Sequence, residues 1–145
     1  MARFLIVDAH SMIFAWPELR SLHARRMVLA REALIRRLTG YQDYSGTRVV
    51  LVFDGQGARA SDDSNKGGIQ IFYSAQGQTA DTVIERLVAK YSGVHDITVA
   101  TGDSMVQQTV TSFGGSAVSA EVLNGMVEDA ERSLQRDLKS HRRKI

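Results

Sequence analysis

The chain has 145 residues, 43% hydrophobic and 23% charged, which is the size and mix of one globular domain. With no Cys and a single Pro, the composition excludes a disulfide-stapled scaffold and any metal site built on thiolates. No apolar run approaches the ~20 residues of a membrane span, and the run Phe4 to Val7 is too short for a secretory signal. We therefore expect a soluble cytoplasmic protein with no membrane segment.

The net charge is only +2, but the charges are segregated along the chain. Basic residues gather before position 40 and after position 130, whereas acidic residues dominate from Asp54 to Asp103. An acidic centre with basic flanks fits a metal site that handles a polyanion. Solvated helix faces would produce the same pattern, so the charges alone leave both interpretations open.

Apolar runs and helical spacings alternate along the chain. The runs predict five strands, at Phe4 to Val7, Val49 to Phe53, Ile69 to Tyr73, Ile97 to Ala100 and near Ala117-Val118. Helices are predicted after Pro17, over about Ser21 to Thr39, after an N-cap at Thr79, from Ser104 to Ser112, and from about Ala120 onward. In the helix over 21–39 the arginines are expected on the outer face, and Gly40 is expected to end it. This alternation predicts a single doubly wound α/β domain with a central parallel five-stranded sheet.

Four aspartates follow the predicted strands. Asp8 comes after the first strand, Asp54 after the second and Asp103 after the fourth, while Asp81 opens the helix that follows the third. All four are expected at the carboxyl edge of the sheet, where open α/β sheets bind their ligands. Clustered carboxylates raise each other's pKa unless a cation holds them, and an all-oxygen ligand set favours Mg²⁺ or Mn²⁺. Each aspartate taken singly could instead cap a helix or a turn.

Several segments together resemble a known family. They are Asp8 to Ile13 with Ala15 to Leu19, Val50 to Asp54, Gln78 to Leu87, and Val99 to Asp103. They resemble the YacP-like branch of NYN domains, which are grouped with the PIN-like nucleases. The resemblance reaches about Val127, so we expect an NYN domain over 1–127 and a charged helical tail over 128–145. It implies the strand order 3-2-1-4-5 and a metal-dependent endoribonuclease.

The chain departs from the family pattern after the first aspartate. The family usually has Gly-Tyr-Asn there, whereas this chain has Ala9-His10-Ser11. Ser11 therefore replaces an amide with a shorter hydroxyl. His10 is interpreted as a partly buried structural histidine, with a base or a phosphate contact as the alternative role.

The resemblance implies an acidic centre of Asp8, Asp81 and Asp103, helped by Asp54, that binds Mg²⁺ or Mn²⁺ and activates water against an RNA phosphodiester. Its products would carry 5′-phosphate and 3′-hydroxyl ends. The candidates for substrate contacts are Ser11, Arg20, Arg25, Arg26, Arg59 and Lys66. The expected partners are RNA, in particular mRNA, and a ribosome, with translation-linked mRNA decay as the implied setting.

Two other classes of protein compete with the nuclease. A non-catalytic RNA- or ribosome-binding module of the same fold would explain the altered Ala9-His10-Ser11 segment. A phospho-acceptor receiver domain would also place acids at Asp8 and Asp54. Receivers usually carry a second acid after the first strand and a Lys after the last, whereas this chain has Ala9 and Ser119-Ala120-Glu121. The receiver interpretation is therefore disfavoured.

Overall fold

The structure is a computed structural model that describes residues 2–55, 61–62 and 68–144. Its centre is a parallel sheet of five strands, β1 (Arg3–Asp8), β2 (Arg48–Phe53), β4 (Gln70–Tyr73), β5 (Asp96–Ala100) and β6 (Ser116–Val118). In space the strands run β4-β2-β1-β5-β6, so the order 3-2-1-4-5 implied by the resemblance is confirmed. A two-residue strand, β3 (Ser61–Asp62), pairs antiparallel with β4 at the edge. This strand is not among the five that the sequence predicts.

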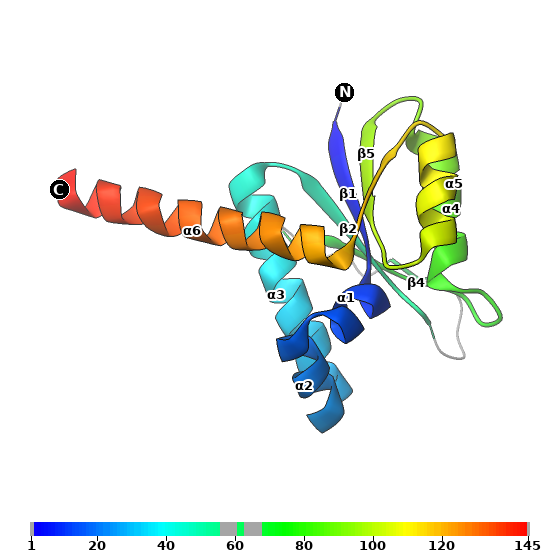
Figure 1. Ribbon diagram of the computed structural model, residues 1–145, viewed down its shortest axis with the longest axis horizontal. Helices are drawn as coiled ribbons and strands as arrows, with labels where there is room; N and C mark the ends of the chain where they lie inside the picture. The colour runs from blue at the N-terminus through cyan, green and yellow to red at the C-terminus, as the bar shows by residue number, and fades with distance from the viewer. Residues whose placement is uncertain (1, 56–60, 63–67, 145) are drawn as a thin grey trace.

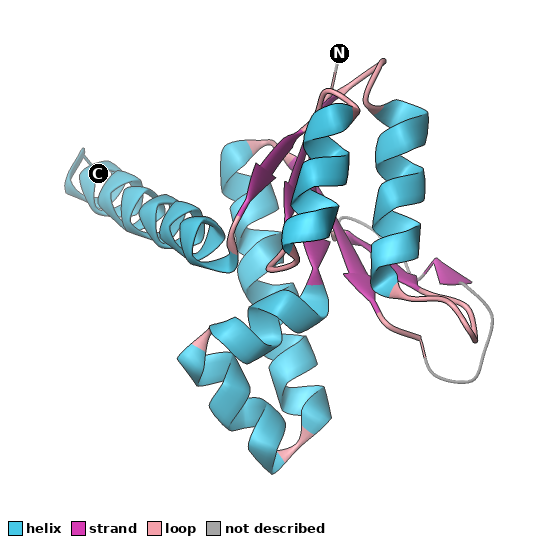
Figure 2. Ribbon diagram, turned by 45° about the vertical axis from the view of Figure 1, so that its right-hand side comes forward, coloured by secondary structure: helices cyan, strands magenta, loops and turns pink. Residues whose placement is uncertain are grey.

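Helices cover both faces of the sheet (Figures 1 and 2). One face carries α1 (Ala9–Ala15), α2 (Pro17–Arg25), α3 (Met27–Ser45) and the start of α6 (Ala120–Lys144), and the other carries α4 (Ala80–Tyr91) and α5 (Ser104–Ser112). Successive residues of β1 alternate between the two cores, Leu5 and Val7 toward the first and Ile6 toward the second. A central parallel strand buried on both faces needs such an apolar run. The predicted doubly wound architecture is therefore confirmed.

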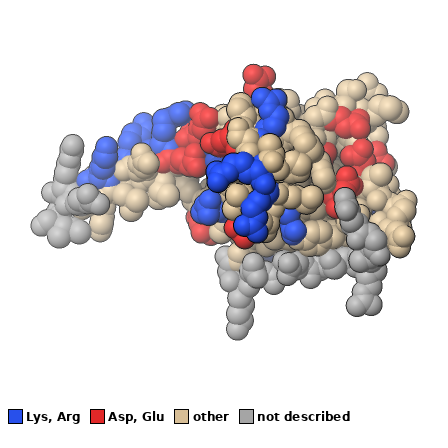
Figure 3. All heavy atoms as spheres, turned by 90° about the horizontal axis from the view of Figure 1, so that it is seen from below, with Lys and Arg blue, Asp and Glu red and all other residues tan. Residues whose placement is uncertain are grey.

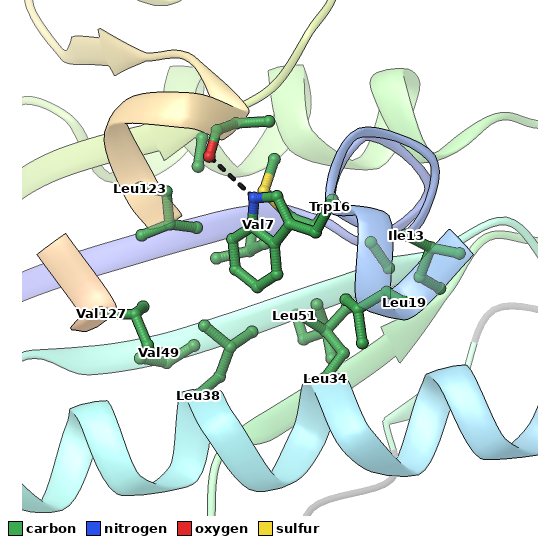
Figure 4. Close-up of a cluster of buried hydrophobic side chains, with 14 of the residues drawn as sticks. Val7, Ile13, Trp16, Leu19, Leu34, Leu38, Val49, Leu51, Leu123 and Val127 are labelled. Atoms are coloured by element: carbon green, nitrogen blue, oxygen red, sulfur yellow. Dashed lines mark hydrogen bonds between the residues drawn. The ribbon is translucent and has the colours of Figure 1, made fainter. Parts of the chain in front are cut away.

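The larger core fixes the segment that follows β1. Trp16 is 3% exposed and packs among Val7, Leu34 and Leu123 (Figure 4), with its indole N–H donating to the Ala120 carbonyl at 2.9 Å. A buried indole N–H needs such a partner. This bond ties the start of α6 to the end of α1, the helix that follows β1.

The helix predicted over 21–39 is wrong in two respects, because it is interrupted at Arg26 and does not end at Gly40. The chain breaks at Arg26, whose extended backbone (φ −157°, ψ 128°) separates α2 from α3. The break lets α2 fold against α3 instead of running on in a straight line. Helix α3 then passes through Gly40 and ends at Gly46, which adopts φ 75°. Glycine inside a helix costs only about 1 kcal/mol, whereas the left-handed ending at Gly46 requires a residue without a Cβ.

The arginines of α3 do not all lie on its outer face, which corrects a second prediction. Arg31 stacks on Phe53 and Tyr73, and Arg37 lies over Trp16 with its guanidinium 4.9 Å from the ring centroid. Long side chains can bury their stems while the charged head seeks a partner, and the aromatic rings supply an attractive surface here. Helical periodicity therefore does not predict the direction of these two side chains.

Helix α6 is continuous from Ala120 to Lys144. Its first turns are buried through Leu123 and Val127, and the rest projects from the body of the molecule (Figure 1). The Tyr44 hydroxyl donates to Asp137 at 3.0 Å, so α3 still contacts the helix well beyond position 127. The division into a domain over 1–127 and a tail over 128–145 stays a prediction. Within the described ranges, none of the helices has the length and apolar run needed to cross a bilayer.

Candidate active site

Asp8 ends β1 as a nearly buried carboxylate, with 6% of the residue exposed. Its Oδ2 accepts hydrogen bonds from the Ser11 hydroxyl at 2.8 Å and from the Thr101 hydroxyl at 3.2 Å. Ser11 Oγ also accepts the Gly102 amide at 2.9 Å, so it links the loop after β5 to the end of β1. Asp8 occupies the N-cap position of α1 but makes no side-chain capping bond. The capping role that sequence alone allows is therefore not the role of Asp8.

Asp103 caps α5, and Asp54 accepts the first amide of α4, each through one oxygen. Asp54 Oδ1 accepts the amide of Ala80 at the start of α4, and its Oδ2 lies 3.8 Å from His10 Nε2. Asp103 Oδ1 accepts the amides of Met105 and Val106 at 2.9 and 3.2 Å. A carboxylate has about four acceptor positions, so these bonds hold both side chains in place without using all of their oxygen lone pairs.

Asp81 is the second residue of α4 and faces the other three acids. Burial, followed by the charges of Asp8, Asp103 and Asp54, raises the pKa of Asp81 from its ordinary 3.8 to about 6. Like charges held together disfavour ionisation, whereas a bound cation would reverse the effect. The charges of the other three acids add to the effect of burial, because all four carboxylates line one cleft.

The four acids line one open cleft of about 490 Å³. The other lining residues are His10, Ser11, Phe14, Thr79, Ala80 and Gly102. Among the described residues, no group of three acidic or histidine side chains already has the geometry of a metal site. The donor set nevertheless suits Mg²⁺ or Mn²⁺, because it offers carboxylates and hydroxyls and no sulfur.

Of the predicted substrate contacts, Ser11 is the one that the described structure places in this cleft. Arg20, Arg25 and Arg26 are exposed and do not line it. Seen from below, basic side chains gather in the middle of the molecule, and acidic side chains lie on both sides of them (Figure 3). Arg59 and Lys66 lie outside the described residues. Their roles stay predictions.

Sequence reasoning missed Thr101 and Phe14 as residues of the site. Thr101, with none of its surface exposed, anchors Asp8, and Phe14, which is 49% exposed, lines the cleft. The only sequence signal for Thr101 is its place directly after a buried strand and before Gly102-Asp103. His10 is partly buried, as predicted, but it lines the cleft and stacks on Phe14 with ring centroids 6.1 Å apart.

A doubly wound sheet in this strand order, with aspartates meeting at its carboxyl edge, defines a nuclease-type fold related to the PIN-like nucleases. The chain belongs to the YacP-like NYN domain family, whose model matches residues 5–144. The family resemblance carried by the sequence motifs is therefore confirmed.

Relatives with similar sequence and structure come from Bacillus subtilis. The chain is 34% identical over 134 residues to the protein named "Uncharacterized protein YacP" of strain 168, an alignment that covers 91% of this chain and 79% of the relative. The crystal structure of Rae1 (YacP) matches with a TM-score of 0.79 and 34% identity, covering 94% of this chain and 80% of that one. A mutant of Rae1 (YacP) matches with a TM-score of 0.81 and 33% identity, covering 94% and 81%.

Proposed function

We propose that this protein is an endoribonuclease that hydrolyses RNA phosphodiester bonds with a divalent cation, Mg²⁺ or Mn²⁺. The observation that carries the proposal is the convergence of Asp8, Asp54, Asp81 and Asp103 on one open cleft in a nuclease-type fold. The raised pKa of Asp81 supports it, because four carboxylates kept together without a cation are unfavourable.

The four aspartates would hold the cation, which when bound lowers the pKa of a water molecule and neutralises charge on the phosphate. The remaining residues keep these acids in place. Thr101 and Ser11 orient Asp8 through its Oδ2, and the first amide of α4 orients Asp54. Because Asp54 and Asp103 are each anchored by one oxygen, both side chains are preorganised before a substrate arrives.

The test is cleavage of an end-labelled single-stranded RNA in Mg²⁺, in Mn²⁺ and in EDTA. Asp8→Asn and Asp81→Asn are compared with Asp96→Asn, an exposed carboxylate at the opposite end of the sheet. We expect metal-dependent cutting that both cleft variants lose and the control keeps, with products that end in a 3′-hydroxyl. Ends with 2′,3′-cyclic phosphate would instead indicate attack by the ribose hydroxyl and would contradict the proposed chemistry.

The setting we propose is translation-linked mRNA decay in the cytoplasm, with mRNA as the RNA substrate and a ribosome as partner. Its support is the family resemblance. The assay therefore has a second arm with translating ribosomes. RNA binding without cutting in either arm would favour the alternative, a non-catalytic RNA- or ribosome-binding module.

A further inference from the structure

A second pocket adjoins the acidic cleft. It has a volume of about 230 Å³, and its walls include His10, His23, Met27, Arg31, Phe53 and Tyr73. His10 and Asp54 line both this pocket and the acidic cleft, so a chain of nucleotides in one would continue into the other.

Arg31 lies in this pocket with its charge unpaired. Its guanidinium carbon is 4.8 Å from the Phe53 ring centroid and 5.2 Å from that of Tyr73, and Nη2 donates to the Tyr73 hydroxyl. Nε is buried without a hydrogen-bond partner, and no carboxylate of the described residues forms an ion pair with Arg31. Asp54 shares the pocket but is held by the Ala80 amide and lies near His10. Arg31 is partly buried, and a partly buried cation without a counter-charge leaves the site open to an anion.

Arg37, further along α3, shows what a purely structural arginine looks like in this fold. It also lies over an aromatic ring, that of Trp16. Its donors are nevertheless satisfied by Glu18 at 2.9 Å, Asn124 at 3.1 Å and Glu131 at 3.3 Å. Arg31 has the same aromatic support without the acids, and this difference indicates a ligand-binding role rather than a structural one.

We propose that Arg31 binds a phosphate of the RNA at the nucleotide next to the one that is cut. This inference rests on the proposed function, because it takes RNA as the ligand. A planar guanidinium held against two rings presents its remaining N–H groups in a fixed direction, which suits a phosphate. The acidic cleft repels a bare phosphate, so a neighbouring cation helps to place the RNA strand beside it.

The test measures binding without cleavage. Fluorescence anisotropy of a labelled single-stranded RNA is recorded in EDTA for the full chain and for Arg31→Gln and Arg36→Gln. Arg36 is exposed on the same helix, so its variant loses the same charge outside the pocket. We expect Arg31→Gln to weaken binding roughly tenfold or more. We also expect it to flatten the dependence of log K on log salt by about 0.7, the value for one phosphate contact with a single strand. Arg36→Gln should change binding far less.

A folding control keeps the test decisive. If thermal unfolding shows that Arg31→Gln is not folded, Arg31→Lys replaces it, since lysine keeps the charge but loses the planar fork and should bind less tightly than the wild type. Equal losses in the Arg31 and Arg36 variants would overturn the proposal, because diffuse charge would then explain binding. So would a folded Arg31 variant with unchanged affinity.

The two proposals fail separately. Metal-dependent cutting with unchanged affinity in the Arg31 variant would remove the phosphate site and leave the nuclease. Weakened binding in the Arg31 variant of a protein that never cuts RNA would remove the nuclease and leave the phosphate site.

Discussion

Replacing Asp81 with Asn should stabilise the folded protein above pH 6 and leave its stability unchanged near pH 4. In the folded state the pKa of Asp81 is raised from 3.8 to about 6, by burial and by the charges of Asp8, Asp103 and Asp54. The folded state therefore binds this proton more tightly than the unfolded chain does. Stability linked to this group is fully present below pH 3.8 and is lost as the pH rises through about 6.

The size of the effect on the free energy of unfolding follows from the same two pKa values. The difference between a pKa of 3.8 and one of about 6 means that ionising Asp81 costs at most ~3 kcal/mol more in the folded state than in the unfolded chain. Asp81 is partly exposed, so solvent screening reduces this value. An acid in the first turn of a helix is also favoured by roughly 0.3–1 kcal/mol, which the asparagine forfeits. We therefore expect Asp81→Asn to raise the free energy of unfolding by about 1 kcal/mol at pH 7.

The assay is urea unfolding of the wild type and Asp81→Asn in EDTA, at several values between pH 4 and pH 8. Asp96→Asn is the control, because Asp96 lies at the other end of the sheet and pairs only loosely with Arg3. The difference in the free energy of unfolding between Asp81→Asn and the wild type should grow as the pH rises from 4 to 6. A difference that stays constant with pH, or a variant less stable than the wild type at pH 7, would refute the reasoning that burial and the neighbouring acids disfavour ionised Asp81.

Four further predictions concern the same site and its scaffold. Mg²⁺ or Mn²⁺ should raise the melting temperature of the wild type but have little effect on Asp81→Asn, as read by differential scanning fluorimetry; equal shifts in both would argue against a metal site in the cleft. Thr101→Val should cost about 1–2 kcal/mol of stability and lower the cleavage rate, because it removes a hydroxyl donor to the buried carboxylate of Asp8. Gly40→Ala should stabilise the protein by ~0.5–1 kcal/mol, because a Cβ there meets nothing within 4 Å on an exposed helix face. Gly55→Ala should be clearly destabilising, since its Cβ would lie 1.8 Å from a backbone carbonyl oxygen, and equal unfolding midpoints for the two glycine variants would contradict the described geometry.

The features that the sequence predicts correctly are those decided by neighbouring residues. The apolar run from Val49 to Phe53 predicts a strand that is buried on both faces of the sheet, and these residues form β2. Thr79 caps α4 by accepting the Thr82 amide, as its position before the helical pattern predicts. Strand ends in a parallel sheet share one edge, so the meeting of the four aspartates also follows from local pattern and topology.

Tertiary packing decides the rest, because the same local pattern permits several outcomes. Nothing local marks Arg26 as a break, since only the docking of α2 against α3 requires one. Arg31 and Arg37 are arginines of the same helix, yet Arg37 is bonded by acids and Arg31 packs against aromatic rings contributed by distant strands. The raised pKa of Asp81 likewise depends on the charge of Asp8, which is far away along the chain and which only the folded sheet brings near. Burial and long-range charge are properties of the assembled fold, and a sequence pattern records only the residue types that can meet there.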